Sequence, residues 1–243
     1  MLARNRPELS LEERAAQKRK IESVKTLLVK IEKDFAPAVF ACSFGAEDMV
    51  LLDLIARFAP GIGIFTLDTG RLPEETYALV KKVAEHYGVK IHAYFPQAQS
   101  VEEYLLQYGP NAFYESVQLR KACCHMRKVE PLKRALQAKK SWISGMRREQ
   151  SATRSEVPDT EFDESNGLQK FNPLYDWTEK EVWAYVVAND VPYNALHDKG
   201  YASIGCAPCT RAITLGEDLR AGRWWWENEQ SKECGLHRKS EAA

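Results

Sequence analysis

The sequence has little of what a membrane protein, a secreted protein or a nucleic-acid binder would need. It has no net charge, because 34 Lys and Arg balance 34 Asp and Glu. A non-specific nucleic-acid binder relies on an excess of cations. The longest apolar stretch, near Met49, is broken by Asp53 and Arg57, well short of the roughly 18 residues that a membrane span needs. The first residues also lack the apolar core of a signal peptide, so we expect a cytoplasmic protein that binds neither membranes nor nucleic acid.

Cysteine is scarce as well, with six in 243 residues, which is too few for a scaffold held by disulfides. A chain of this length buries roughly 70% of its unfolded surface and needs no such support. With 44% apolar and 28% charged residues, its composition is that of an ordinary globular domain. In a reducing compartment, a few cysteines at short spacings more often bind metal or perform thiol chemistry.

Short apolar runs alternate with helical patterns along most of the chain. This alternation indicates an α/β fold with a doubly wound, mostly parallel sheet. An acidic segment at 155–167 predicts a mobile loop, and Thr178 with Glu181 predicts a capping box at a helix start. The pattern predicts strands at 38–42, 62–67, 89–95 and 141–145. It predicts one or two helices within 9–35, a helix that follows residues 43–48 and runs to Phe58, and helices at about 73–86 and 178–189.

Polar segments follow three of the predicted strands, where ligands bind in such sheets. Residues 43–48 form a strand-to-helix turn, whose free N–H groups favour an anion, although an ordinary capped helix has the same pattern. Residues 145–154 carry Arg147, Arg148 and Arg154. Guanidinium groups match phosphate or sulfate oxygens, while a solvated charge run is the alternative interpretation.

Two pairs of cysteines predict a metal centre. Cys123 and Cys124 precede Cys206 and Cys209 by about 80 residues, and together they offer the four thiolates that zinc or an iron–sulfur cluster requires. Neighbouring residues on a helix diverge by about 100°, which suits a wide cluster better than a single zinc ion. The alternative is that these cysteines are small buried apolar residues. A lone tail cysteine such as Cys234 would by itself be an incidental surface thiol.

Three motifs resemble those of the assimilatory adenylyl-sulfate (APS) reductases, relatives of the phosphoadenylyl-sulfate (PAPS) reductases. They are Cys-Cys-His-Met-Arg-Lys at 123–128, Cys-Ala-Pro-Cys-Thr-Arg at 206–211 and Glu-Cys-Gly-Leu-His at 233–237. Segments 43–48 and 67–71 extend the resemblance over nearly the whole chain. The resemblance implies the adenine-nucleotide alpha-hydrolase-like (ATP pyrophosphatase-like) fold. Phe44 replaces the first glycine of the phosphate loop in that fold, which argues against ATP hydrolysis.

The resemblance also implies a reaction, in which adenosine 5′-phosphosulfate is reduced to sulfite and AMP in sulfate assimilation and cysteine biosynthesis. Cys234 would be the nucleophile that forms an S-sulfocysteine, which thioredoxin or a glutaredoxin-like protein would resolve. A [4Fe-4S] cluster would be bound by Cys123, Cys124, Cys206 and Cys209. The expected substrate-binding residues are Ser43, Phe44, Gly45, Leu67, Asp68, Thr69, Gly70, Lys128, Gly145, Arg147, Arg148, Arg154, Arg220 and Arg223.

Further expectations concern organisation and specificity. We expect one reductase domain over 1–210 and a mobile tail over 211–243 that carries Cys234, with the N-terminal helices as an interface of a homo-oligomer. Lys128 follows Cys124 by four residues, which on an α-helix places both on one face, between cluster and substrate. PAPS as the substrate, alone or beside APS, is the nearest alternative. A zinc-stapled nucleotide-binding module is the more distant one, and it would leave Cys234 without a role.

Overall fold

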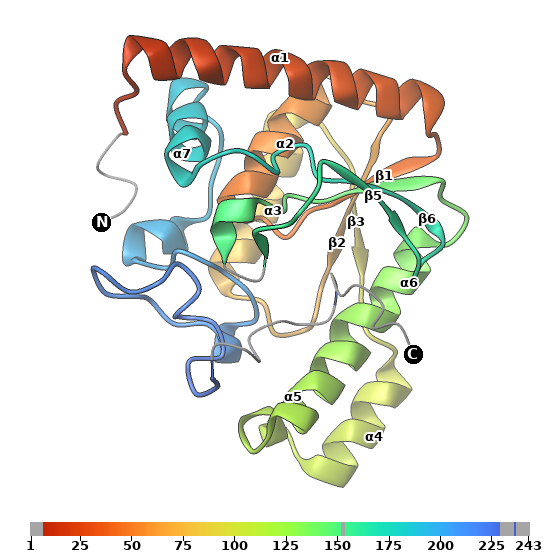
Figure 1. Ribbon diagram of the computed structural model, residues 1–243. Helices are drawn as coiled ribbons and strands as arrows, with labels where there is room; N and C mark the ends of the chain where they lie inside the picture. Colours follow the sequence, from red (N-terminus) through yellow and green to blue (C-terminus); the bar gives the residue numbers. More distant parts are fainter. Residues whose placement is uncertain (1–6, 152–153, 229–235, 237–243) are drawn as a thin grey trace.

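The computed structural model describes residues 7–151, 154–228 and 236. A six-stranded sheet lies at its centre, with the strand order β3-β2-β1-β4-β6-β5. All neighbouring strands are parallel except β5 and β6. The strands are β1 (Ala38–Ala41), β2 (Gly63–Leu67), β3 (Ile91–Tyr94), β4 (Ser141–Ile143), β5 (Thr160–Asp163) and β6 (Leu168–Phe171) (Figure 1). The predicted doubly wound, mostly parallel sheet is confirmed.

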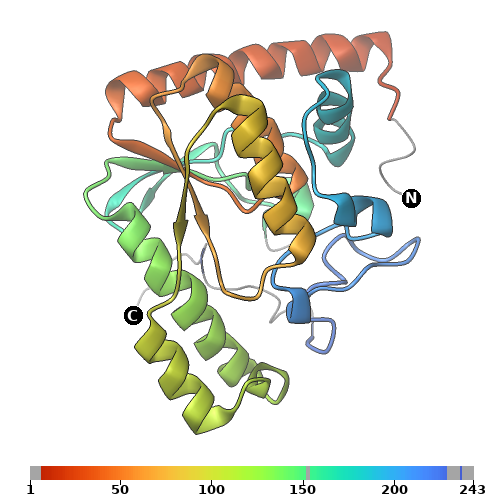
Figure 2. The ribbon, with the colours of Figure 1, turned by 180° about the vertical axis from the view of Figure 1, so that it is seen from behind.

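Helices cover both faces of this sheet. Figures 1 and 2 show α2 (Ala46–Phe58), α3 (Glu74–Tyr87) and α7 (Glu179–Ala188) on one side and α6 (Glu130–Leu136), which continues from α5 (Val117–Cys124), on the other. Successive side chains of a strand point to opposite faces of the sheet and so contribute to the apolar cores on both sides. Phe40 packs on the α2 side, while its neighbour Val39 packs against α6. The helices are α1 (Leu11–Asp34), α2 (Ala46–Phe58), α3 (Glu74–Tyr87), α4 (Ala98–Tyr108), α5 (Val117–Cys124), α6 (Glu130–Leu136) and α7 (Glu179–Ala188).

The ends of several helices follow from local sequence signals. Thr178 and Glu181 form the predicted capping box of α7, and Ser10 with Glu13 caps α1 in the same way. Gly88 ends α3 with a left-handed φ of 65°, which a glycine adopts without strain. Within the ranges described, no helix is both long and apolar enough to cross a membrane.

The predicted loop at 155–167 is wrong in part, because it contains a strand. Strand β5 pairs with β6 in an antiparallel hairpin at the edge of the sheet. Its side chains are exposed or half-buried, and two of its four residues are acidic. A short polar edge strand has the composition of a loop, and here cross-strand pairing stabilises it. Glu161, for instance, accepts a hydrogen bond from the buried Lys170 ammonium at 2.8 Å.

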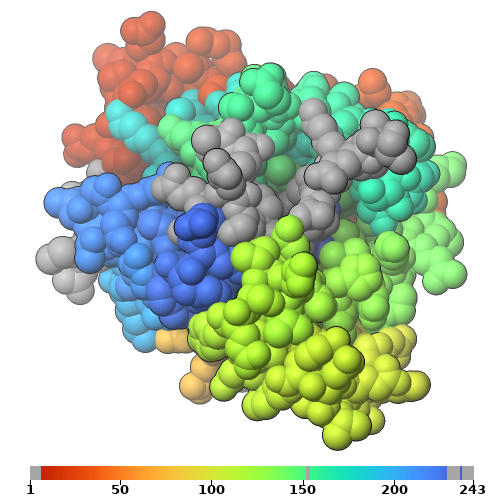
Figure 3. All heavy atoms as spheres, turned by 60° about the horizontal axis from the view of Figure 1, so that its bottom comes forward, coloured from red at the N-terminus to blue at the C-terminus, as the bar shows by residue number. Residues whose placement is uncertain are grey.

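Residues 211–228, the first part of the predicted tail, pack against the body of the protein. Thr210 and Arg223 form an antiparallel bridge, and Trp224 is only 1% exposed. This segment lies beside the α4–α5 hairpin, as the space-filling view shows (Figure 3). The predicted mobility of the tail stays a prediction. The division of the chain at residue 210 stays a prediction.

Candidate active site

The main cavity lies where the strand order reverses. The chain runs from β1 outward to β3 and then returns to β4 on the other side of β1, so a crevice opens at the carboxyl ends of these strands. The cavity has a volume of about 230 Å³. Ten of the fourteen predicted substrate-binding residues line it, namely Ser43, Gly45, Leu67, Thr69, Lys128, Gly145, Arg147, Arg154, Arg220 and Arg223.

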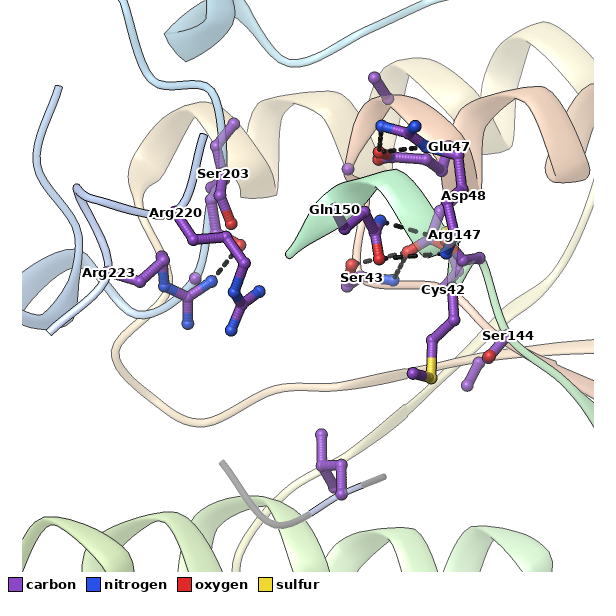
Figure 4. A pocket seen from close by; sticks show the side chains of 18 of the residues that line it. Cys42, Ser43, Glu47, Asp48, Ser144, Arg147, Gln150, Ser203, Arg220 and Arg223 are labelled. Carbon is purple, nitrogen blue, oxygen red and sulfur yellow. Dashed lines mark hydrogen bonds and ion pairs between the residues drawn. The ribbon is translucent and has the colours of Figure 1, made fainter. Parts of the chain in front are cut away.

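Two walls face one another across this cavity. Figure 4 shows Ser203, Arg220 and Arg223 on one side, opposite the loop and helix start that carry Ser43 and Asp48. The first wall is cationic and comes from the C-terminal third of the chain. The second comes from the turn between β1 and the start of α2, and the first N–H groups of a helix have no partner within the helix itself.

The turn between β1 and α2 is held by one carboxylate. Asp48 Oδ2 accepts hydrogen bonds from both the Ser43 backbone N–H and the Ser43 hydroxyl, each at 2.6 Å. Burial raises the pKa of Asp48 to about 7. Gly145 makes room for this group, since a Cβ at that position would lie 2.2 Å from Asp48 Oδ1. The predicted contact residue Gly145 therefore also has a packing role.

Phe44 occupies a backbone conformation that usually calls for glycine. Its φ is 63°, in the left-handed region, and its side chain is fully buried. A non-glycine residue there is strained by roughly 1–2 kcal/mol, which burial of a phenyl ring can offset. Phe44 therefore holds a left-handed turn that a glycine would adopt without strain.

A buried ion pair stabilises the same wall. The Arg147 guanidinium donates to Glu47 Oε1 through Nε at 3.0 Å and Nη2 at 2.8 Å. Burial raises the pKa of Glu47, but the charge and hydrogen bonds of Arg147 outweigh burial and lower it overall. Arg154 Nη1 donates to Gln150 Oε1 at 2.5 Å. The arginines of this loop are thus organised by acidic and amide partners.

Four predicted substrate-binding residues do not line the cavity. Phe44 is buried beneath the loop, and Gly70 has a φ of 70° in the turn after β2. Asp68 is turned to local partners and accepts from the Gly70 N–H and the Tyr77 hydroxyl. Arg148 is directed to the Val157 carbonyl and the Tyr175 ring. Spacing along the loop could not show this, because alternate side chains of an irregular segment point in different directions.

The four paired cysteines come together as predicted from their spacing in the chain. Cys123, Cys124, Cys206 and Cys209 belong to one buried cluster and line one small cavity of about 20 Å³. The cavity has a cationic rim made of Arg71, Arg120, Arg127 and Lys128.

The tandem pair sits where an α-helix changes its pitch. Helix α5 ends at Cys124 and continues as a π-helical turn, His125–Val129, before α6 begins. The α-helical spacing assumed for Cys124 and Lys128 is therefore wrong, since a π-turn has wider hydrogen-bonded rings. Lys128 nevertheless lines both the cysteine cavity and the larger cavity, so it lies at the boundary between them.

The electrostatic environment differs among these thiols. Burial raises the pKa of Cys209 to about 12 and also raises that of Cys123. For Cys206 burial acts in the same direction, but the charge of Lys128 and a hydrogen bond with Thr69 outweigh it and lower the pKa. Four thiolates crowded into one buried space repel one another. A positively charged metal centre is what would let all four ionise.

The residues around the cysteines fit an iron–sulfur cluster. Among the residues described, no three His, Cys, Asp or Glu side chains lie close enough to hold a metal ion, so the fit is judged from the donors around the thiols. Arg127, which lines the cysteine cavity, has its Nε buried without a hydrogen-bond partner in the part of the chain described. Buried donors are normally paired, and cluster sulfur atoms would supply acceptors.

Contacts that the sequence analysis missed join the two cavities. Thr69, in the turn after β2, has its hydroxyl 3.2 Å from Cys206 Sγ, and its carbonyl accepts from Arg127 Nη1 at 2.6 Å. Arg127 directly precedes Lys128 in the motif that carries the tandem cysteines, so its place in the motif could have suggested it. No local signal indicated the contact between Thr69 and Cys206, because 137 residues separate them.

A buried ion pair fixes the beginning of the C-terminal segment. Arg120 Nη2 and Glu227 Oε2 are 2.7 Å apart, with side chains only 0% and 2% exposed. The same guanidinium lies 4.7 Å from the centre of the Trp224 ring. Arg120 is on α5, one turn before the tandem cysteines. This contact therefore links the helix of the tandem cysteines to residues 224–227 of the C-terminal segment.

Cys234 lies outside the described residues. Leu236, two positions further, is described: it lines the larger cavity and packs against the core that includes Phe65, Leu132 and Trp142. The chain therefore returns to this cavity close to its C-terminus.

Comparisons with known proteins show the family and the fold of this chain. Residues 37–212 match the model of the phosphoadenosine phosphosulfate reductase domain. The chain is 57% identical to the adenosine 5′-phosphosulfate reductase of Allochromatium vinosum, over 88% of this chain and 83% of that protein. It is similar to the crystal structure of a PAPS reductase from Candida auris, with 32% identity, a TM-score of 0.68 and coverage of 85% and 98%. It also shares the fold of the FMN adenylyltransferase of Candida glabrata, with a TM-score of 0.57, 14% identity and coverage of 99% and 86%.

Proposed function

The chain belongs to the phosphoadenosine phosphosulfate reductase family, and from this premise we propose that it reduces adenosine 5′-phosphosulfate to sulfite and AMP. The observation that carries the proposal is the pairing of a nucleotide-sized cavity with a cysteine-lined cavity, which share Lys128 at their boundary. The 57% identity to an APS reductase, against 32% to a PAPS reductase, favours APS over PAPS as the substrate.

The larger cavity would hold the nucleotide at the ends of β1, β2 and β4. The turn after β1 offers backbone N–H groups to an anion. The opposite wall presents Arg220 and Arg223 (Figure 4). Cations on this wall and at Lys128 would neutralise the sulfuryl oxygens and the phosphate that leaves. Such residues act in a partly buried site, where their charges are screened less than in water.

The four paired cysteines would hold a [4Fe-4S] cluster. When bound, the cluster would place charge beside the sulfuryl group and hold the two cysteine segments together, so its role would be electrostatic and structural. Arg127, whose Nε is buried without a partner among the described residues, lines the same cavity and would offer this centre a donor. Thr69 and Lys128 would orient the substrate-facing side of this centre.

Cys234 would be the nucleophile. Its thiolate attacks the sulfuryl sulfur, the bond from that sulfur to the bridging oxygen breaks, and AMP departs with the electron pair. The enzyme then carries Cys234 as an S-sulfocysteine. The contact of Leu236 with the cavity supports this role, because two residues of chain span at most about 7 Å.

A dithiol protein of the thioredoxin or glutaredoxin type would complete the cycle. One of its thiolates attacks the Cys234 sulfur and expels sulfite, and its second thiol then closes its own disulfide and releases the Cys234 thiolate. The two electrons that reduce the substrate thus come from the dithiol, in a reducing cytoplasm. The homo-oligomer expected through the N-terminal helices stays a prediction.

The test of this function is the covalent intermediate. With APS and no reductant, the wild-type protein should gain the mass of one SO₃ group, and Cys234→Ser should gain none while still binding AMP. Cys42→Ser is the matched control, because it removes a buried thiol from the same cavity and should leave the adduct in place. An adduct on Cys234→Ser would show that another residue is the nucleophile.

Substrate preference is tested by letting APS and PAPS compete in a reaction with thioredoxin. We expect sulfite to form mainly from APS. Equal or faster turnover of PAPS would replace the proposed substrate without changing the nucleophile.

A further inference from the structure

The Arg223 guanidinium lies between the Trp224 ring and the backbone of residues 204–205. Its side chain is 6% exposed, and its guanidinium carbon lies 4.7 Å from the centre of the Trp224 ring. Its Nη1 donates to the Ile204 carbonyl at 3.0 Å. The guanidinium therefore lies against the backbone of residues 204–205, directly before Cys206, and borders the nucleotide cavity.

Gly205 is what leaves space for this arrangement. A Cβ at Gly205 would lie 2.2 Å from Arg223 Nη2, 2.5 Å from Cζ and 2.7 Å from Nη1. Real Cβ contacts of this kind are essentially never shorter than 3.0 Å. The three nearest atoms all belong to the guanidinium, and the φ of Gly205 is outside the left-handed region. Glycine is therefore needed here for the close approach of Arg223 and not for the backbone conformation.

We propose that Gly205 is a positioning residue that sets the place of the Arg223 charge between the two cavities. The proposal rests on the proposed function, in which Arg223 faces the anionic part of the nucleotide. A methyl group at 205 meets only the end of a flexible side chain, so it would displace the guanidinium and leave the fold intact. The displaced Arg223 would lose its bond to Ile204 and its stacking on Trp224, and its charge would leave the cavity wall.

Binding of APS and adenosine to four variants tests this coupling. In a Cys234→Ser background, which prevents turnover, Gly205→Ala should weaken APS binding about 10-fold, the effect of losing one charge-assisted hydrogen bond. Adenosine, which carries no anionic group, should lose less than about 2-fold. The double variant Gly205→Ala/Arg223→Met should bind APS no more weakly than Arg223→Met alone. Losses that multiply would mean that Gly205 acts independently of Arg223 and would overturn the proposal.

Thermal unfolding gives a second readout that does not depend on the substrate. Gly205→Ala should lower the unfolding midpoint in the wild-type background and have no such effect in the Arg223→Met background, where the space is vacant. If Gly205→Ala alone does not fold, recovery by Arg223→Met supports the proposal and failure to recover overturns it. Failure of the wild type to bind APS would contradict the proposed function, while the thermal cycle would still decide the role of Gly205.

Gly61→Ala is the matched control for both readouts. A Cβ there would lie 2.6 Å from the carboxylate of Glu32, at an exposed position remote from both cavities. It introduces the same kind of clash with the end of a flexible charged side chain. It should leave APS binding unchanged, and an equal loss of APS binding in this variant would overturn the assignment.

Discussion

The nucleotide cavity and the cysteine cavity adjoin each other but are built in different ways. The larger one follows from the topology of the sheet, since the segments after β1, β2 and β4 meet wherever parallel strands are neighbours. The smaller one joins segments about 80 residues apart, one at the π-helical interruption after α5 and one at a short 3-10 turn, Ala207–Cys209, and neither segment belongs to a strand of the sheet. Topology therefore secures the first cavity, while the second depends on particular side-chain contacts and on the metal centre it would bind.

The largest effect is expected when one of the four thiols that line the cysteine cavity is removed. In Cys209→Ser, we expect iron and acid-labile sulfide to be lost and sulfite formation to fall by at least about 100-fold. AMP binding should change by less than about 3-fold, because the strand ends that form the nucleotide cavity do not depend on the metal. Iron analysis, visible absorption and AMP titration measure these effects. A loss of AMP binding parallel to the loss of iron would show that the two cavities form one cooperative unit.

A second test uses two adjacent carboxylates in the wall of the nucleotide cavity. Burial raises the pKa of Asp48 from 3.8 to about 7, so its ionisation opposes folding increasingly as the pH rises from about 4 to 7, and fully above 7. Asp48→Asn, which keeps an acceptor for Ser43, should stabilise the protein above pH 7 by on the order of 4 kcal/mol. The gain should disappear near pH 4.

Glu47 should show the opposite sign. Its pKa is lowered overall because Arg147 outweighs burial, so its ionisation favours folding above its unfolded pKa, and this contribution is lost as the pH falls through the folded pKa. Glu47→Gln should therefore destabilise the protein at neutral pH, and less in acid. Denaturant unfolding between pH 2 and 8, a range that extends below the lowered pKa of Glu47, compares the two variants. A difference from wild type that does not vary with pH would contradict both assignments.

The smallest expected effect concerns the backbone of Phe44. Replacing a buried phenylalanine destabilises a protein by about 3–5 kcal/mol, and alanine is normally tolerated better than glycine. At a φ of 63° this order should reverse, so that Phe44→Gly is more stable than Phe44→Ala by about 1 kcal/mol. Phe40, equally buried but in β1, is the matched control, and there the usual order should hold. Denaturant unfolding of the four variants makes the comparison.

Much of the site was predictable because its signals are local. A strand, a polar turn and a helix recur along the chain, and the direction of parallel strands then places the turns at one edge. This predicted the positions of Ser43, Thr69 and Gly145 in the cavity wall. The direction of individual side chains was not predictable in the same way. Arg148 turns to Tyr175 while Arg147, the residue before it, lines the cavity.

The sequence by itself determined the four parallel strands β1 to β4, the capping box of α7 and the two cysteine pairs, because periodicity and short motifs depend on neighbours within a few residues. Only the tertiary structure decided that β5 is a strand, that the turn after Cys124 is π-helical and that Thr69 touches Cys206. The role of Gly205 is of the same kind, since a glycine that serves a side chain 18 positions away leaves no local pattern. These features are contacts between distant segments, and they become fixed only when the whole chain packs.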